Sequence, residues 1–215
     1  MQRSDLKQEE YVSLLRKIVP IIVEKGLKST TMDTVASRLG MSKRTLYEIF
    51  ETKDQLLRDA ISQMEQDNHD FVKKTFASTE NVREALIEIF RYNRDRFEQV
   101  NVDFFRDMDR LYKNKREEYE RYSRARQDSM MQLFETGVSQ GMFRADVDYR
   151  VQSRIMGIQM ESLKRMEEFF PSDIKLIRVF DAIIVGFLRS IASEKGMRIL
   201  DMLTKELTHK EETNI

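Results

Sequence analysis

The residues best suited to chemistry in this sequence form one short polar run with a tyrosine one turn on. Two hydroxyl side chains flank two cations in it, and the members are Ser42, Lys43, Arg44, Thr45 and Tyr47. Arginine can grip two acceptors on a guanine edge, and lysine can reach a base or a phosphate. Hydroxyl and phenol groups donate hydrogen bonds to phosphate oxygens. These side-chain types in this order predict contacts to double-stranded DNA.

Two short helices joined by a tight turn would place this run on an exposed ridge. Two such helices pack closely only if a small residue lies at their contact, here Ala36, and if Gly40 supplies the turn. The apolar residues that would hold the pair together are Val35, Leu39, Met41, Leu46 and Ile49. This spacing predicts a helix-turn-helix unit whose second helix enters the major groove. A plain helical hairpin with a solvated Lys43 and Arg44 stays as the alternative.

Local signals predict where these helices begin. Thr30-x-x-Asp33 has the spacing of a capping box for the first helix, and Ser42 is a natural N-cap for the second. Thr52-x-x-Gln55 is another capping box, so Lys53 lies at the start of a further helix, where its ammonium could meet a phosphate. Thr31, at the start of the first helix of this pair, could also contact a phosphate. The candidate DNA contacts are therefore Thr31, Ser42, Lys43, Arg44, Thr45, Tyr47 and Lys53.

The composition predicts a helical protein with a basic amino-terminal end. The 215 residues include 7 Gly, 2 Pro, 2 His and no Cys, and 37 Lys and Arg balance 37 Asp and Glu. So few glycines and prolines argue against sandwiches, barrels and doubly wound sheets. Residues 1–53 hold 10 Lys and Arg against 7 Asp and Glu, which fits a DNA contact confined to that end. The apolar run 18–23 is too short for a membrane span and no signal peptide is recognisable, so we expect a cytoplasmic protein.

Helical periodicity divides the chain into helices with short connections. Gly26, Gly141 and Pro171 mark helix ends, and Pro20 predicts a kink in the first helix or a shorter helix. The expected helices cover roughly residues 7–25, 30 or 31 to 39, 42–50, 52–75, 81–97, 102–112, 115–139, 148–170 and 172–194, with a short one after Gly196. We predict an all-α protein with an N-terminal three-helix helix-turn-helix domain (1–53) and a larger helical domain (54–215).

Residues 11–60 resemble the N-terminal domain of the tetracycline-repressor (TetR) family of transcriptional regulators. The matching residues, in order, are Gly26, Thr31-Met32, Val35-Ala36, Gly40 to Lys43, Thr45 to Tyr47, Phe50, Lys53 and Leu56-Leu57. The later stretch Gly141-Met142-Phe143-Arg144-x-Asp146 looks like the family's link before its dimerisation helices. The resemblance implies a bacterial homodimer that binds a palindromic operator and acts as a repressor.

The same resemblance implies that residues 54–215 bind a small-molecule effector and form the dimer. Dimerisation would use the helices near 148–170 and 172–194, and effector binding would release the operator. The pocket would be lined by phenylalanines and methionines on expected helix faces, namely Phe97, Phe104, Phe105, Met108, Met130, Phe134 and Met160. Each of these side chains could equally belong to an ordinary helical core.

Enzymatic and metal-binding alternatives find little support in the sequence. A di-iron helical bundle needs two Glu-x-x-His motifs, and the chain has one, at Glu206 and His209. We therefore predict a protein that is not an enzyme, with no catalytic residue, no metal site and no cofactor. The alternative function is a helical adaptor that binds a protein partner without DNA. The basic stretch from Lys113 to Arg126 could serve such a partner, but its interspersed glutamates favour a solvated face.

Overall fold

The structure, a computed structural model, describes residues 6–79, 82–101, 103–104, 107–108, 111, 130–131 and 133–201. Within these ranges every regular element is a helix, and the single β-type pairing is an isolated bridge between Phe143 and Ala192. The prediction of an all-α fold is confirmed. The chain forms two compact units, residues 1–70 with 99–122 and residues 71–98 with 123–215. No described helix is both long and apolar enough to cross a bilayer.

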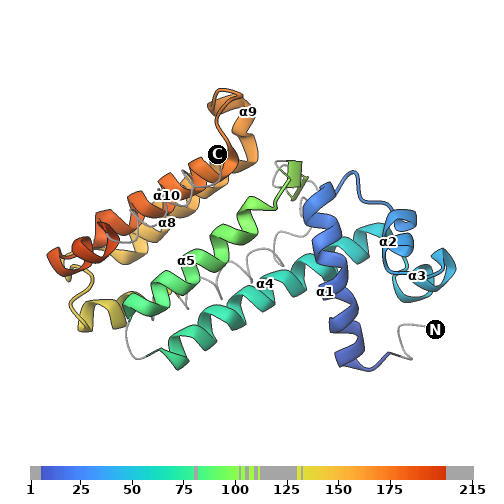
Figure 1. The fold of residues 1–215 in the computed structure, drawn as a ribbon, viewed down its shortest axis with the longest axis horizontal. Coiled ribbons are helices and arrows are strands. Elements are labelled where there is room, and N and C mark those ends of the chain that lie inside the picture. Colours follow the sequence, from blue (N-terminus) through green and yellow to red (C-terminus); the bar gives the residue numbers. More distant parts are fainter. Residues whose placement is uncertain are drawn as a thin grey trace, which may run out of the picture. The chain divides into compact units, whose positions relative to one another are not determined.

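The first unit contains the amino-terminal helices. They are α1 (Gln8–Lys25), α2 (Met32–Arg38), α3 (Lys43–Ile49) and the first part of α4 (Lys53–Ser78) (Figure 1). α1 runs through Pro20 to Lys25, so the helix is not shortened there, and it buries Ile18 and Ile22 on one face. These side chains join Val35 of α2 and Leu46 of α3 in a single apolar core. The core fixes which face of α3 is turned outward.

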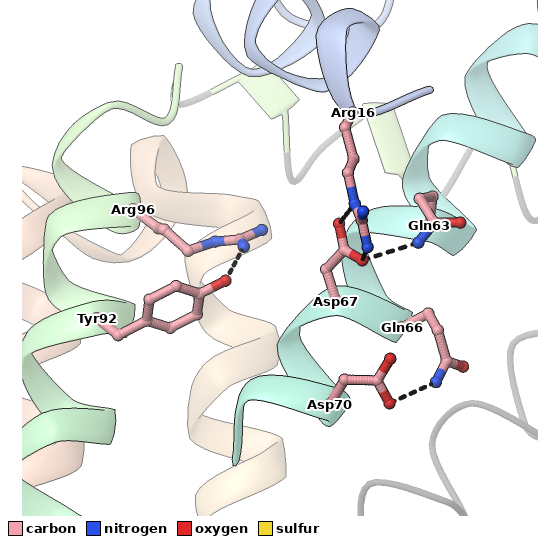
Figure 2. A network of polar contacts seen from close by, with 7 residues as sticks. All are labelled: Arg16, Gln63, Gln66, Asp67, Asp70, Tyr92 and Arg96. Atoms are coloured by element: carbon pink, nitrogen blue, oxygen red, sulfur yellow. Dashed lines mark hydrogen bonds and ion pairs between the residues drawn. The ribbon is translucent and has the colours of Figure 1, made fainter. Parts of the chain in front are cut away.

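An ion pair ties α1 to α4 within this unit. Figure 2 shows that the guanidinium of Arg16 donates two hydrogen bonds to the carboxylate of Asp67, at 2.9 and 2.7 Å. Asp67 also accepts a hydrogen bond from the side-chain amide of Gln63 at 2.8 Å. The hydrogen bond and the charge of Asp67 raise the pKa of Arg16 above its usual value. The contact is exposed, so its main effect is to orient the two helices.

The caps predicted for α3 and α4 are present. The Ser42 hydroxyl accepts a hydrogen bond from the backbone N–H of Thr45 at 3.0 Å. The Thr52 hydroxyl accepts one from the N–H of Gln55 at 3.1 Å, and the Gln55 side chain accepts one from the N–H of Glu51. The Ser42 and Thr52 bonds each satisfy a donor that the first helical turn leaves without a partner, and the Gln55 bond reaches the residue before the cap, so these helices begin where the sequence indicates.

The capping box predicted at Thr30 and Asp33 is wrong by one residue. Thr31 is the N-cap of α2, and its hydroxyl accepts a hydrogen bond from the N–H of Thr34 at 3.1 Å. Thr30 is buried instead, and its hydroxyl donates to the carbonyl of Gly26 at 2.7 Å. Two adjacent threonines offer the same capping chemistry, and the core selects between them.

The connection between α1 and α2 is held by residues near position 100. The backbone N–H of Lys28 donates to the carboxylate of Asp107 at 2.9 Å, and that of Asn101 donates to the carbonyl of Val23 at 3.0 Å. Phe104 is buried in the core of the first unit. Asn101, Phe104 and Asp107 therefore pack with the amino-terminal helices. The domain boundary expected after residue 53 stays a prediction.

The second unit contains the end of α4 and the later helices. They are α5 (Val82–Glu98), α8 (Tyr149–Ser162), the 3-10 turn η2 (Leu163–Arg165), α9 (Met166–Phe169) and α10 (Leu176–Ile191). α10 packs beside α5 and α8 (Figure 1). The rings of Phe71 and Tyr92 stack with their centroids 3.8 Å apart and join the end of α4 to α5. The helices expected at 102–112 and 115–139 lie largely outside the described residues.

The single helix predicted over 148–170 is wrong. α8 begins as expected, with Asp148 as its N-cap, but it ends at Ser162. A 3-10 turn and the four-residue α9 follow before Pro171. Neither glycine nor proline marks this change, whereas Leu163 at the turn is buried in a local apolar cluster. Tertiary packing therefore outweighs helical propensity at this point.

The helix predicted over 172–194 is also shorter than expected. α10 begins at Leu176 with Lys175 as its N-cap, and it ends at Ile191. Before it, the N–H of Ile174 donates to the carbonyl of Pro171 at 3.0 Å and closes a turn. Pro171, Ser172 and Asp173 are residue types that favour turns, which is why Ser172 does not cap the helix.

Candidate nucleic-acid interface

α3 divides its side chains between a buried and an exposed face. Leu46 and Ile49 are buried in the core of the first unit. Lys43, Arg44 and Tyr47 are exposed, and 45% of Tyr47 is accessible to solvent. Because the buried residues fix the rotation of a helix only seven residues long, the basic and phenolic side chains face outward together. The structure thus brings the polar run onto one exposed ridge.

The candidate hydroxyl groups lie at the starts of α2 and α3. The Ser42 and Thr45 hydroxyl oxygens are 2.7 Å apart, and those of Thr31 and Thr34 are 2.9 Å apart. Ser42 and Thr31 are exposed, and Thr45 is half-buried. Their capping bonds hold them in place, so each hydroxyl is a fixed group at a helix start.

Each cation of the ridge contacts a carboxylate of the same unit. The ammonium of Lys43 lies 2.9 Å from the carboxylate of Asp33 on α2. The hydrogen bond that Lys43 donates to Asp33, and then the charge of Asp33, raise the pKa of Lys43 above its usual value. The Nε of Arg44 donates to Oε1 of Glu48 at 3.0 Å. Glu48 is not among the residues expected from the sequence, although its spacing of four residues from Arg44 is a signal for such a pair.

Lys53 makes a contact that the sequence did not predict. Its ammonium donates a hydrogen bond to the carbonyl of Lys28 at 2.9 Å, and the contact is exposed. Lys28 lies in the turn before α2. The backbone N–H of Lys28 donates to the carboxylate of Asp107. Lys53 therefore braces the turn before α2, and its contact with a phosphate stays a prediction.

The residues expected to line an effector pocket fall into three apolar clusters. Phe104 and Met108 pack in the core of the first unit. In the second unit, Met130 and Phe134 belong to one cluster. Phe97 and Met160 belong to another, where the ring of Phe97 stacks on Phe180 at a centroid distance of 4.0 Å. Phe105 lies outside the described residues. The described members thus do not form a single cluster, and their role in effector binding stays a prediction.

An open groove of about 420 Å³ lies over the end of α4 and the first half of α5. Its lining residues are Phe71, Glu84, Ile87, Glu88, Arg91 and Tyr92. In the same unit the guanidinium of Arg96 donates to the hydroxyl of Tyr92 at 2.6 Å (Figure 2). Its carbon also lies 5.2 Å from the centre of the tyrosine ring. None of these residues was expected from the sequence, because the groove depends on how α4 packs against α5.

The amino-terminal domain is similar to a known family of regulatory proteins. Residues 14–60 match the family model of bacterial regulatory proteins of the tetR family. Those residues include α2, α3 and all of the ridge. No curated protein sequence matches the chain significantly.

Solved structures of regulators share the fold. The ketosteroid transcriptional regulator KstR2 of Mycobacterium tuberculosis is 20% identical, with a TM-score of 0.55 over 88% of this chain and 98% of its own. A TetR-family regulator from Agrobacterium tumefaciens is 15% identical, with a TM-score of 0.65 over 87% of this chain and 100% of its own. A transcriptional regulator from Saccharomonospora viridis, in complex with choline, is 17% identical, with a TM-score of 0.57 over 87% of this chain and 100% of its own. The amino-terminal domain thus matches the tetR family of bacterial regulatory proteins, and the chain shares its fold with solved regulators.

Proposed function

We propose that this protein is a homodimeric transcriptional repressor that binds a palindromic operator through the exposed face of α3. The match of residues 14–60 to the family of bacterial regulatory proteins supports regulation by DNA binding. The finer proposal rests chiefly on the exposed ridge. Lys43, Arg44 and Tyr47 face outward because Leu46 and Ile49 lie in the core. Such an arrangement suits a helix that enters a major groove.

The residues of the ridge and of its surroundings can be given separate roles. Arg44 has a planar fork suited to a base edge, whereas Lys43 and Lys53 are point charges suited to phosphates. The fixed hydroxyls of Thr31, Ser42 and Thr45 and the phenol of Tyr47 can donate to the DNA backbone or to a base. Phosphate contacts of this kind hold the protein in register, and the base contact selects the sequence.

The exposed face of α8 supports a dimer. Val151, Ile155 and Ile158 are exposed to 53%, 44% and 64%, and their spacing of four and three residues places them on one side of the helix. α10 packs against α8, so these two helices would form the interface. A second copy would bury the apolar stripe and present two α3 helices to half-sites roughly 34 Å apart or a multiple of that distance. One short recognition helix reads few base pairs, so two copies are needed for an operator.

A small molecule bound by the helical region would control operator binding. Among the solved structures, one regulator is named for ketosteroids and another is in complex with choline. In this chain the Phe and Met side chains and the groove over α4 and α5 are the proposed contacts. An effector that binds better to a dimer with another spacing of its α3 helices lowers operator affinity by that difference in binding energy. We place this activity in the cytoplasm, where the chromosome of a bacterium lies.

Selection of bound duplexes from a random DNA library tests the proposal directly. The recovered duplexes should be palindromic, and their affinity should fall with salt at a slope of about −0.9 per phosphate contact on a log–log plot. Operator-length DNA should bind two chains. If the purified protein binds no duplex at low ionic strength, the proposal is wrong and the helical adaptor becomes the better explanation of the fold.

A further inference from the structure

The charges of α3 run against the stability of its own helix. Lys43 and Arg44 occupy the first turn, which carries no acidic residue, and Glu48 lies near the end, where the last turn carries no basic residue. Acidic side chains stabilise the start of a helix and basic ones its end. A pair with the basic residue first is also the weaker order at a spacing of four. Helix stability therefore does not explain why Arg44 and Glu48 are paired here.

The geometry of the pair leaves half of the guanidinium available. The Nε of Arg44 donates to Oε1 of Glu48 at 3.0 Å. The side chain of Glu48 is 30% exposed, whereas that of Arg44 is 89% exposed. Among the described residues, Arg44 has no further hydrogen-bond partner at its two terminal nitrogens. Glu48 therefore holds the Nε of the guanidinium, and the two terminal nitrogens face solvent on the ridge.

A fork held in this way matches one base. Guanine presents two acceptors, O6 and N7, on its major-groove edge, and the two terminal nitrogens of arginine can donate to both. A carboxylate on Nε fixes the plane of the guanidinium before the DNA arrives, so less side-chain freedom is lost on binding. We propose that Glu48 is a positioning residue that orients Arg44 to read a guanine in each operator half-site. This inference rests on the proposed DNA-binding function and adds the base that is read.

The test uses the full chain and duplexes recovered by selection from random DNA. Each half-site should contain one guanine whose replacement weakens wild-type binding roughly 5- to 100-fold. In Arg44→Ala that dependence should disappear. In Glu48→Ala the dependence should fall to a few-fold, while affinity for unrelated duplexes is unchanged or rises because a negative charge is lost. Glu48→Gln keeps an acceptor for Nε, so it should restore most of the discrimination.

A matched control is available in the second unit. Arg94 and Glu98 form an ion pair with the same order and spacing, and the guanidinium lies 2.7 Å from the carboxylate. Glu98→Ala therefore removes a comparable contact and should leave base preference unchanged. Thermal melting of each variant separates loss of fold from loss of recognition. The inference is wrong if the guanine dependence survives Arg44→Ala, or if Glu48→Ala weakens all duplexes by the same factor. Those results would leave the proposed function intact, whereas a wild-type chain that binds no duplex would refute both.

Discussion

Lys43 carries its charge beside a carboxylate that a phosphate would have to displace. Asp33 is exposed and lies 2.9 Å from the ammonium, so it competes with DNA for Lys43 and repels the phosphate backbone. We therefore expect Asp33→Asn to tighten binding to every duplex by roughly 2- to 10-fold, with no change of base preference. Fluorescence anisotropy at fixed ionic strength, with the selected operator and with an unrelated duplex, measures both quantities.

Asp173→Asn is the matched control for this prediction. Asp173 is an exposed aspartate in the second unit, so its substitution changes the net charge by the same amount away from the ridge. Equal gains in the two variants would mean that net charge alone governs affinity. Weaker binding by Asp33→Asn would show that Asp33 instead holds Lys43 in its productive position.

The sequence predicted the residue types on the ridge better than their partners. The buried and exposed positions of α3 follow from helical spacing, and the spacing of Arg44 and Glu48 is visible in the sequence. The contact of Lys43 with Asp33 is not visible in the sequence, because it depends on the angle at which α2 crosses α3. The choice of Thr31 over Thr30 as a cap has the same origin. Contacts within one helix can be predicted from spacing, whereas contacts between helices need the fold.

At the scale of elements, the turn before α2 depends on one distant side chain. Asp107 is buried, and one of its oxygens accepts the backbone N–H of Lys28 at 2.9 Å. Asp107→Ala removes this acceptor, and we expect it to lower the free energy of unfolding by about 1–3 kcal/mol. Asp107→Asn keeps an acceptor and should cost less. Urea unfolding followed by circular dichroism provides the comparison.

An exposed aspartate outside the turn gives the reference value. Asp95→Ala on α5 should change the free energy of unfolding by less than about 0.5 kcal/mol, since surface substitutions rarely do more. If Asp107→Ala were as harmless as Asp95→Ala, the turn would not depend on this hydrogen bond. Lys53, which contacts the same turn, would then be its main support.

The elements themselves were predictable where local chemistry sets their ends. Ser42 and Thr52 cap the helices that follow them, and Gly26 ends α1 in a conformation with a φ of +78°. The break after Ser162 has no such signal, because the buried Leu163 rather than a glycine or proline accompanies it. Pro171 did mark a boundary, but the turn after it delays α10 to Leu176. Packing decides the ends that local signals leave open.

At the scale of the whole molecule, the sequence could not show which distant segments fold together. Residues near position 100 complete the first unit, since Asn101 and Phe104 pack with helices that lie about eighty residues earlier. The expected pocket residues show the same limit, because their common residue types gave no information about which cluster each would join.

The exposed stripe on α8 leads to a prediction about assembly. If two copies bury Val151, Ile155 and Ile158 against each other, a charge at the most exposed of these positions enters the interface twice. We expect Ile158→Glu to weaken the dimer by about 3–6 kcal/mol, from the lost burial of two isoleucine side chains. Sedimentation velocity at several concentrations should then show monomers where the wild type is dimeric.

The same substitution links assembly to recognition, because a monomer offers one α3 helix to an operator with two half-sites. Operator affinity should therefore fall with the dimer, while the unfolding temperature of the monomer and its weak binding to unrelated DNA change little. Gln159→Glu adds the same charge at the neighbouring exposed position of α8 and should leave both assembly and affinity near wild type. An Ile158→Glu chain that stays dimeric, or a monomer that binds the palindrome as tightly as the wild type, would exclude α8 as the surface that pairs the two recognition helices.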